Sequence, residues 1–290
     1  MSDNDGRIAG LPIWSGPVEI APLSGGISNL SFTVVDRSGK YVVRVTRDFP
    51  FHHVFRDREV MSARAAHAAG FAPEVVHAEP GLMVSRFIDG RVLTSADIRS
   101  NVPRVARFLR RFHHNMPGYV SGPGFMFWVF HVNCDYMRQL RDDGASGDFD
   151  RWLAINTELE AAQLPLPIAF GHHDLLPANI IDDGRRLWLI DYEYAGFGTA
   201  MFDLANLSSN NSLSADQSSV LLESYFESPP SSALVKSHVA MEAASLLREA
   251  LWSLVSIGRL DRPGVDYKAY ADENFIKLDA ALASYRERFA

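Results

Sequence analysis

The segment that ends at Asp191 carries polar side chains with a spacing suited to phosphate chemistry. Asp174 precedes Asn179, and a predicted β-hairpin over residues 180–190 separates Asn179 from Asp191. Because a hairpin brings its two ends together, we expect Asn179 and Asp191 to lie side by side. An amide oxygen and a carboxylate are hard ligands suited to Mg²⁺ that also holds phosphates. The Asp174 carboxylate could then orient a hydroxyl group and accept its proton as phosphate is transferred.

Several residues near this segment have simpler explanations. His172 is more typical of a histidine that fixes a loop from the core than of a catalyst, and His173 is expected to be an exposed loop residue. The run from His172 to Asp174 could hold zinc in a hydrolase, although no further histidine follows nearby at ligand spacing. Asp182 and Asp183 precede a glycine, which predicts turn residues rather than ligands.

A glycine-rich segment over residues 23–30 leads directly into a predicted strand. Paired glycines allow the backbone to approach phosphate groups closely, and neighbouring polar side chains can donate hydrogen bonds. No Gly-Lys-Ser/Thr sequence follows, which excludes a Walker loop. A plain turn before a strand is the alternative interpretation. The candidate phosphate-binding residues are Ser24, Gly25, Gly26, Ser28 and Asn29.

Arg44 lies in the next predicted strand, on the face opposite Val43 and Val45. A lone arginine in that position usually faces solvent. Opposite a glycine-rich loop, it could instead pair with nucleotide phosphates, and Glu59 on the following predicted helix could hold it in place.

The elements around these residues fall into two groups. Alternating apolar residues predict a hairpin over residues 30–45; a helix over 56–69, ended by Gly70, and strands near 75 and over 82–85 follow. Beyond residue 90 the pattern is helical. One apolar face runs from Ile98 to Phe112, after the cap candidates Thr94 and Ser95; another helix covers 151–163, and helices resume at 215. We therefore predict an α+β fold with a small β-rich lobe over 1–88 and a larger, mainly helical lobe over 89–290.

Composition limits the classes of function. The chain has 290 residues, of which 47% are hydrophobic, so it has material for a sizeable core. Its net charge of −7 lacks the basic surplus that nucleic-acid binding needs, so no nucleic-acid partner is expected. The acidic first residues are not typical of a signal peptide, and the apolar run 125–130 is too short for membrane insertion. With Cys134 as the single cysteine, we expect a cytoplasmic protein.

The pattern His-x-Asp-x-x-x-x-Asn, followed by a hairpin and Ile-Asp, matches the catalytic and metal loops of protein-kinase-like phosphotransferases. Taken together, LSGGISNLSF, YVVRVTRD, SRFIDGR, GHHDLLPANII and LIDYEYAGFGTAMFDLANL resemble the choline/ethanolamine kinase family, within the wider aminoglycoside-phosphotransferase and protein-kinase-like group. The resemblance extends from about Leu23 to Asn206 and weakly beyond. The sequence IDYEYAGFG is the most discriminating part of this resemblance. The resemblance as a whole implies the two-lobed protein-kinase-like fold.

This resemblance implies a role for each matching residue. Asp174 becomes the base, and Asn179 and Asp191 become ligands of Mg²⁺, with Glu193 as a further acidic group near metal or substrate. Arg44 and Glu59 become an ion pair that contacts the phosphates of ATP. The connector residues Phe87 and Ile88 would present backbone groups to adenine. Asp203 would be a structural carboxylate that ties the catalytic region to the helical lobe; a helix N-cap is the competing interpretation.

The acceptor site departs from the family pattern. The family uses two tryptophans three residues apart on a C-terminal helix, and a later tyrosine, to hold a quaternary ammonium by cation–π attraction. Here Trp252 matches the second tryptophan and Tyr270 the tyrosine, but Glu249 replaces the first tryptophan. A carboxylate there suits a primary ammonium or a polar sugar. A core tryptophan beside a solvated glutamate is the alternative.

The expected activity is the transfer of the γ-phosphoryl group of ATP, with Mg²⁺, to the hydroxyl of a small amino alcohol such as choline or ethanolamine. An aminoglycoside or sugar phosphotransferase is the first alternative. A non-catalytic nucleotide-binding protein and a metal hydrolase are the others. The acceptor is a small molecule in each transferase interpretation, and the sequence defines no oligomeric state.

Overall fold

The computed structural model describes residues 3–23, 30–122, 124–260 and 264–289. The candidate phosphate-binding residues Ser24, Gly25, Gly26, Ser28 and Asn29 lie outside the described residues, so their role stays a prediction.

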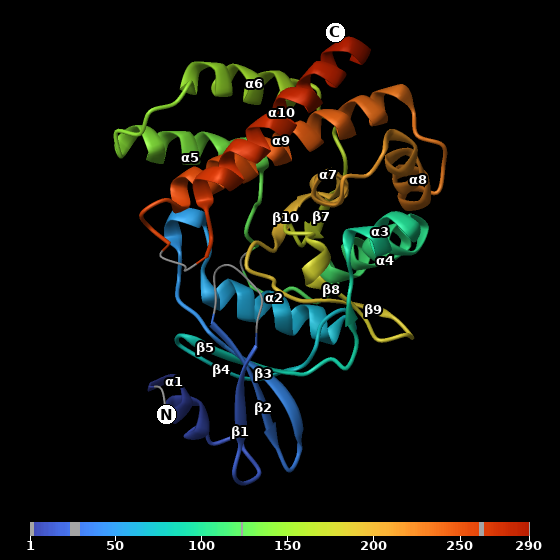
Figure 1. The fold of residues 1–290 in the computed structure, drawn as a ribbon. Helices are drawn as coiled ribbons and strands as arrows, with labels where there is room; N and C mark the ends of the chain where they lie inside the picture. The colour runs from blue at the N-terminus through green and yellow to red at the C-terminus, as the bar shows by residue number, and fades with distance from the viewer. Residues whose placement is uncertain (1–2, 24–29, 123, 261–263, 290) are drawn as a thin grey trace.

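The N-terminal part forms a five-stranded antiparallel sheet (Figure 1). Its strands, in chain order, are β1 (Glu19–Leu23), β2 (Leu30–Asp36), β3 (Gly39–Val45), β4 (Val75–Glu79) and β5 (Leu82–Arg86), arranged as β1-β2-β3-β5-β4. The predicted hairpin is β2–β3, whose turn is fixed by the Asp36 carboxylate as it accepts from the amides of Ser38 and Gly39. Val34, Val43 and the helix α1 (Asp3–Ala9) contribute to a small separate core.

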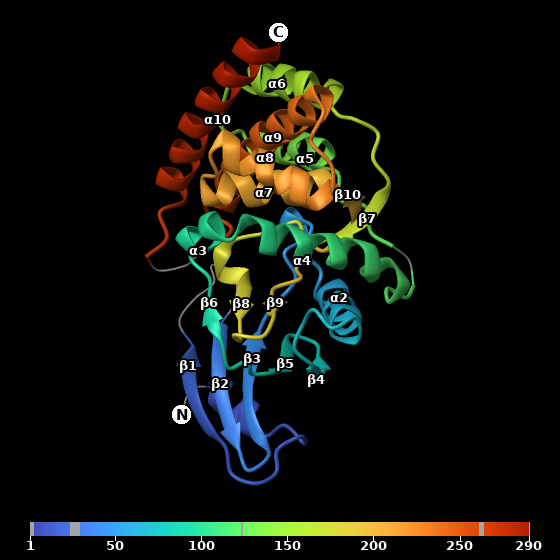
Figure 2. The same ribbon diagram turned by 90° about the vertical axis from the view of Figure 1, so that its right-hand side faces the viewer.

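Helix α2 (Arg56–Ala68) follows the 3₁₀ turn η1 (Pro50–His52), and both views place it between the sheet and the helical part of the molecule (Figures 1 and 2). Gly70 ends the helix as predicted. It has a φ of +83°, and the amides of Gly70 and Phe71 bond back to the last helical turn.

A second, three-stranded sheet lies between the two parts of the molecule and carries the predicted hairpin of the candidate site. Its strands are β6 (Arg91–Val92), β8 (Ile180–Asp182) and β9 (Leu187–Leu189), in the order β6-β8-β9. Gly90 permits the close approach of β6, because a Cβ there would lie 2.7 Å from Ile181 Cγ2 and 2.9 Å from the carbonyl oxygen of Asp182. Asp183 lies in the predicted turn, whereas Asp182 is the last residue of β8 and pairs with Leu187.

The apolar face predicted from Ile98 to Phe112 is divided between two helices, α3 (Ser95–Ser100) and α4 (Val102–Asn115). The break falls at Asn101, whose backbone is non-helical, and Pro103 starts the second helix. Thr94 caps α3 as predicted, since its side chain accepts from the Asp97 amide in a capping box.

The C-terminal part is built around the long helix α9 (Ser232–Ser256). This helix contacts α5 (Val129–Asp142), α6 (Phe149–Ala161), α7 (Ala200–Asn211) and α10 (Tyr267–Phe289) (Figure 1). The predicted helix over 151–163 is α6, which begins slightly earlier, and α8 (Ala215–Phe226) packs against α4. A short antiparallel pair, β7 (Ile168–Gly171) with β10 (Gly196–Thr199), was not predicted.

The predicted α+β, two-lobed, protein-kinase-like architecture is confirmed. The sheet and the helical layers lie at opposite ends of the molecule, with α2 and the β8–β9 hairpin between them (Figures 1 and 2). The boundary near residue 88 stays a prediction. Within the part of the chain that the structure describes, no helix combines the length and apolar character needed to cross a bilayer.

Candidate active site

The loop that carries Asp174 is anchored by the buried carboxylate of Asp203, in the first turn of α7. Asp203 accepts hydrogen bonds from the amides of His172 (2.8 Å) and His173 (2.7 Å) and pairs with His113 Nε2 (2.8 Å). Thr199 is the residue that caps α7. The interpretation of Asp203 as a structural carboxylate is therefore confirmed over that of an N-cap. Burial opposes ionisation, but the His113 bond and nearby charges outweigh it and hold the pKa of Asp203 well below its usual range.

Asn206, one turn after Asp203, fixes the other side of Asp174. Its Oδ1 accepts from the Leu175 amide at 2.7 Å, and its Nδ2 donates to Ser245 Oγ of α9 at 3.1 Å. Sequence reasoning missed Asn206 and His113. Asn206 could have been found from its spacing of three residues from Asp203, which puts both on one helical face. No local pattern in the sequence marked His113.

The two histidines before Asp174 are both buried. His172 Nε2 lies 2.9 Å from the Ile190 carbonyl oxygen, so this residue fixes the loop from the core as predicted. The expectation that His173 is exposed was wrong. Its ring stacks on Phe127 at 4.2 Å, and burial lowers its pKa to about 4. Gly171 leaves space for that ring, because a Cβ there would lie 2.3 Å from His173 Nε2.

Asp174 and Asn179 contact each other directly. Asn179 Nδ2 donates to the Asp174 carbonyl oxygen (2.9 Å) and to Asp174 Oδ2 (3.1 Å). This assignment of the amide leaves the oxygen of Asn179 as the atom able to bind a cation. Burial is the largest cause that raises the pKa of Asp174 well above its usual range, with further repulsion from Glu249.

The hairpin brings Asn179 and Asp191 to the same place. Ile190 donates its amide to the Asn179 carbonyl oxygen at 3.0 Å, and Asp191 follows at once with a left-handed φ of +67°. A non-glycine residue in that conformation is uncommon and often marks a functional position. Asp191 Oδ1 lies 2.9 Å from Arg44 Nη2.

Arg44 and Arg56 connect three carboxylates across the two lobes. Arg44 donates to Glu59 at 2.5 Å and to Asp191, while Arg56 donates to Glu59 at 2.6 Å and to Glu193 at 3.0 Å. The predicted neighbours Arg44 and Glu59 are thus an ion pair in the structure. Arg56 was missed, although its spacing from Glu59 on α2 was visible. Burial, followed by repulsion from Asp191, raises the pKa of Glu193 to about 7.

The connector residues Phe87 and Ile88 join β5 to the second sheet. The Phe87 amide donates to the Lys40 carbonyl oxygen at 3.0 Å, and Lys40 Nζ lies 3.7 Å from the centre of the Phe87 ring. The first of the two backbone amides is therefore already bonded within the sheet. An adenine contact at this connector stays a prediction.

Of the predicted acceptor residues, Glu249 and Tyr270 contact each other directly, whereas Trp252 packs on His52. Glu249 accepts from Tyr270 Oη at 3.2 Å and is paired with Arg248. Trp252 is only 9% exposed and stacks on His52 at 4.9 Å. Both Glu249 and Trp252 are buried, so the alternative of a solvated glutamate does not describe this structure.

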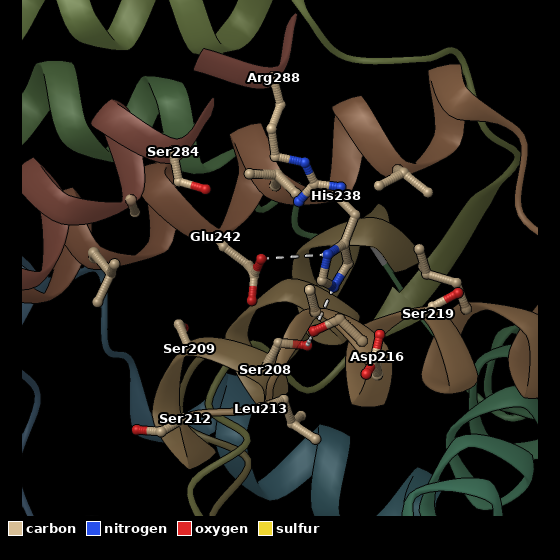
Figure 3. A pocket seen from close by; sticks show the side chains of 17 residues that line it. Ser208, Ser209, Ser212, Leu213, Asp216, Ser219, His238, Glu242, Ser284 and Arg288 are labelled. Atoms are coloured by element: carbon tan, nitrogen blue, oxygen red, sulfur yellow. Dashed lines mark hydrogen bonds and ion pairs between the residues drawn. The ribbon is translucent and has the colours of Figure 1, made fainter. Parts of the chain in front are cut away.

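A cavity of about 470 Å³ lies elsewhere, between α7, α8, α9 and α10. Figure 3 shows the hydroxyl group of Ser208 and the pair His238–Glu242 at this cavity. None of the candidate site residues lines this cavity, so it is not the expected acceptor site.

A small antiparallel sheet, a helical lobe and the group Asp174, Asn179 and Asp191 at their junction define the protein-kinase-like class of phosphotransferases. A family model described as "Phosphotransferase enzyme family" matches residues 19–232. The chain belongs to this family.

Curated relatives match part of the chain. Protein LicA of Haemophilus influenzae is 25% identical over 210 residues, or 69% of this chain and 61% of the relative. A probable ethanolamine kinase of Arabidopsis thaliana is 28% identical over 204 residues, 63% of this chain and 54% of the relative. The chain thus spans less than two thirds of the length of either protein.

Solved structures match nearly the whole chain. A choline/ethanolamine kinase family protein from Mesorhizobium loti is 29% identical, with a TM-score of 0.77 over 97% of this chain and 95% of its own. Choline kinase LicA from Streptococcus pneumoniae has a TM-score of 0.79 over 97% and 98%, and at 21% identity it supports the fold alone. The resemblance read from the sequence motifs is confirmed.

Proposed function

We propose that this protein transfers the γ-phosphoryl group of ATP, with Mg²⁺, to the hydroxyl of a small amino alcohol such as choline or ethanolamine. The observation that supports this most directly is the convergence of three groups. Asp174 accepts from the Asn179 amide, the hairpin places Asp191 beside them, and Arg44 of the other lobe contacts Asp191.

The reaction assigns each group one task. The acceptor oxygen forms a bond to the γ-phosphorus as the bond from phosphorus to the ADP oxygen breaks, and the hydroxyl proton passes to Asp174. A carboxylate with a raised pKa accepts that proton more readily than an ordinary one. The transferred group needs little covalent assistance, so positioning and charge neutralisation supply most of the rate.

The residues at the end of the hairpin fit Mg²⁺. Asn179 offers an amide oxygen and Asp191 a carboxylate, both hard oxygen donors, and Glu193 adds a carboxylate two residues further on. Mg²⁺ bound there would neutralise charge on the phosphates. Arg44 lies next to the same carboxylate and would contact the phosphates from the N-terminal lobe.

Glu249 and Tyr270 support the choice of an amine acceptor. The carboxylate and the phenol are hydrogen-bonded to each other, and Glu249 belongs to the charged surroundings of Asp174. The names of two relatives, a probable ethanolamine kinase and a choline/ethanolamine kinase family protein, support the same acceptor class.

The test is ADP formation from Mg-ATP with choline, ethanolamine, sugars and aminoglycosides as acceptors. We expect activity with an amino alcohol, and a loss of at least about a thousandfold in kcat in Asp174→Asn with ATP affinity nearly unchanged. Asp150→Asn, at an exposed helical position, is the matched control and should retain full activity. Full activity of Asp174→Asn would remove Asp174 from the mechanism. Phosphorylation of sugars or aminoglycosides alone would replace the amino-alcohol assignment.

A further inference from the structure

Arg248, in the middle of α9, is a buried cation next to the proposed acceptor residues. It is 2% exposed, and its Nη1 donates to Glu249 Oε1 at 2.6 Å. Its Nε and Nη2 are also buried, and neither has a hydrogen-bond partner among the residues that the structure describes. A buried donor without an acceptor is costly and rare in folded proteins, so these two atoms call for a chemical explanation.

The two nitrogens share one edge of the guanidinium group. Nε–H and the neighbouring Nη2–H point in nearly the same direction, and this edge binds the two oxygens of a carboxylate or phosphate in a bidentate fashion. The donors that remain on Arg248 therefore match one oxyanion rather than two separate acceptors.

The location of Arg248 connects it with the reacting groups. Its guanidinium carbon lies 4.4 Å from the centre of the Tyr194 ring, and Tyr194 Oη accepts from Trp252 Nε1 at 2.9 Å. The charge of Arg248 also acts on Asp174, whose ionisation it favours. Arg248 thus belongs to the cluster in which the acceptor of the proposed reaction would be held.

An internal ion pair is a weak explanation for this arrangement. Adjacent residues on a helix do not face each other, and the pair between Arg248 and Glu249 uses only one of the three guanidinium nitrogens. The cluster also contains the carboxylates of Asp174 and Glu249. An anionic acceptor would be repelled by both of them unless a cation such as Arg248 stood beside it.

We propose that Arg248 binds an oxyanion of the acceptor, so that the preferred acceptor is an amino alcohol that also carries a carboxylate. Glu249 and Tyr270 then contact its ammonium group, and Asp174 receives its hydroxyl proton. This inference rests on the proposed function and specifies its substrate class. A phosphomonoester offers the same oxyanion chemistry and forms a separate arm of the test.

The experiment compares ethanolamine with serine, which differs from it by one carboxylate, and with choline and phosphoethanolamine. We expect the wild-type protein to prefer serine to ethanolamine in kcat/KM by at least tenfold. Arg248→Met removes a charge that also favours ionisation of Asp174, so kcat/KM should fall with both acceptors, but by about a hundredfold more for serine, which alone loses a bidentate charged contact. Arg248→Lys keeps the charge without the forked donors, so its kcat/KM for serine should lie between those of the wild-type protein and Arg248→Met. Phosphoethanolamine is the product of the ethanolamine reaction and has no free hydroxyl; its inhibition should be equal in the wild-type protein and Arg248→Met if the arginine site is shaped for a carboxylate.

Several results would overturn the inference. One is a wild-type preference for ethanolamine or choline over serine; another is an equal loss with both acceptors in Arg248→Met, as expected of a purely structural arginine. Strong inhibition by phosphoethanolamine that is lost in Arg248→Met, without turnover of serine, would replace the carboxylate with a phosphate. Should Arg248→Met fail to fold, Arg248→Lys, which keeps a charge beside Glu249, takes its place in the comparison of serine with ethanolamine.

The proposed function can fail separately. In that case ADP forms only with a sugar or an aminoglycoside. Calorimetric titration of the wild-type protein and Arg248→Lys with serine then decides on Arg248 independently of turnover. Serine binding that weakens in Arg248→Lys supports the oxyanion site, and the absence of serine binding to the wild-type protein overturns it.

Discussion

Replacing Asp203 with asparagine changes one atom in the anchor of the loop that carries Asp174. In the wild-type protein Asp203 Oδ1 accepts from the His173 amide, while Oδ2 accepts from the His172 amide and lies 2.8 Å from His113 Nε2. Asparagine keeps a single acceptor oxygen. If that oxygen takes the place of Oδ2, the new NH₂ group faces the His173 amide, and two donors oppose each other.

The magnitude follows from these three contacts. One buried donor without an acceptor costs about 1–3 kcal/mol, and the two remaining bonds each lose the charge assistance of an ionised acceptor, about 1 kcal/mol apiece. We therefore expect Asp203→Asn to lower the free energy of unfolding by about 3–5 kcal/mol. For a chain of this size the corresponding fall in Tm is roughly 10 °C.

The assay is urea unfolding together with enzyme kinetics at a temperature below the Tm of both the wild-type protein and Asp203→Asn. The kcat of Asp203→Asn should be at least tenfold lower, because Asp174 is held less firmly. Acid adds a second readout. Burial raises the pKa of Asp203, but the His113 bond outweighs it and lowers the pKa below its ordinary value. The stability contributed by the ionised carboxylate is therefore present above the ordinary pKa and is lost as pH falls below about 4. Asp203→Asn should lack this component. Asp142→Asn, at an exposed position, is the control and should behave like the wild type. If the free energy of unfolding of Asp203→Asn lies within about 0.5 kcal/mol of the wild-type value and its kcat is unchanged, the reasoning is refuted.

Three further predictions follow from the same contacts. Asp191→Ala should abolish the gain in ATP affinity that Mg²⁺ provides, measured by calorimetry with and without the metal; an equal gain in the variant would exclude Asp191 as a ligand. Burial raises the pKa of Glu242 from the ordinary 4.5 to about 8, against the attraction of Arg288, so the native state retains a proton that the unfolded chain releases and stability falls as pH rises through this window. Glu242→Gln should therefore match the wild-type Tm at pH 4 and exceed it at pH 9, and a constant difference between the two pH values would contradict the burial argument. Trp252→Ala should lower the free energy of unfolding by about 3–5 kcal/mol, because it removes a large buried ring stacked on His52, and a loss below about 1 kcal/mol would show that the ring is not part of the core.

Sequence reasoning succeeded where the signal was local. The turn at residues 36–39 and the period-two alternation around it defined the first hairpin, and the spacing of Asn179, the second hairpin and Asp191 defined where the two polar side chains meet. In each case a short segment determines its own geometry, because turn chemistry fixes the register of the strands on either side.

The missed features depend on contacts between distant segments. His113 and Asp203 are 90 residues apart, and Arg56 and Glu193 are 137 apart. Strands β7 and β10 pair over four residues each, and neither segment has an alternating apolar pattern that would predict a strand. The error at His173 has the same origin, since its burial depends on Phe127 and on the space left by a glycine, and neither is visible as a property of the loop itself.

The ion pairs between the lobes occupy the atoms that the proposed reaction would use. Arg44 contacts Glu59 through one nitrogen and Asp191 through another, so one guanidinium joins β3, α2 and the end of the β8–β9 hairpin. A cation bound at Asp191 would compete with Arg44 for the same carboxylate, while phosphate oxygens would compete with Asp191 for the same guanidinium. Both exchanges would favour the nucleotide and the metal together over either one alone, because each partner released by one would be taken up by the other. The bond from Arg44 to Glu59 does not enter this exchange, and it therefore keeps the arginine aimed at the site in both arrangements.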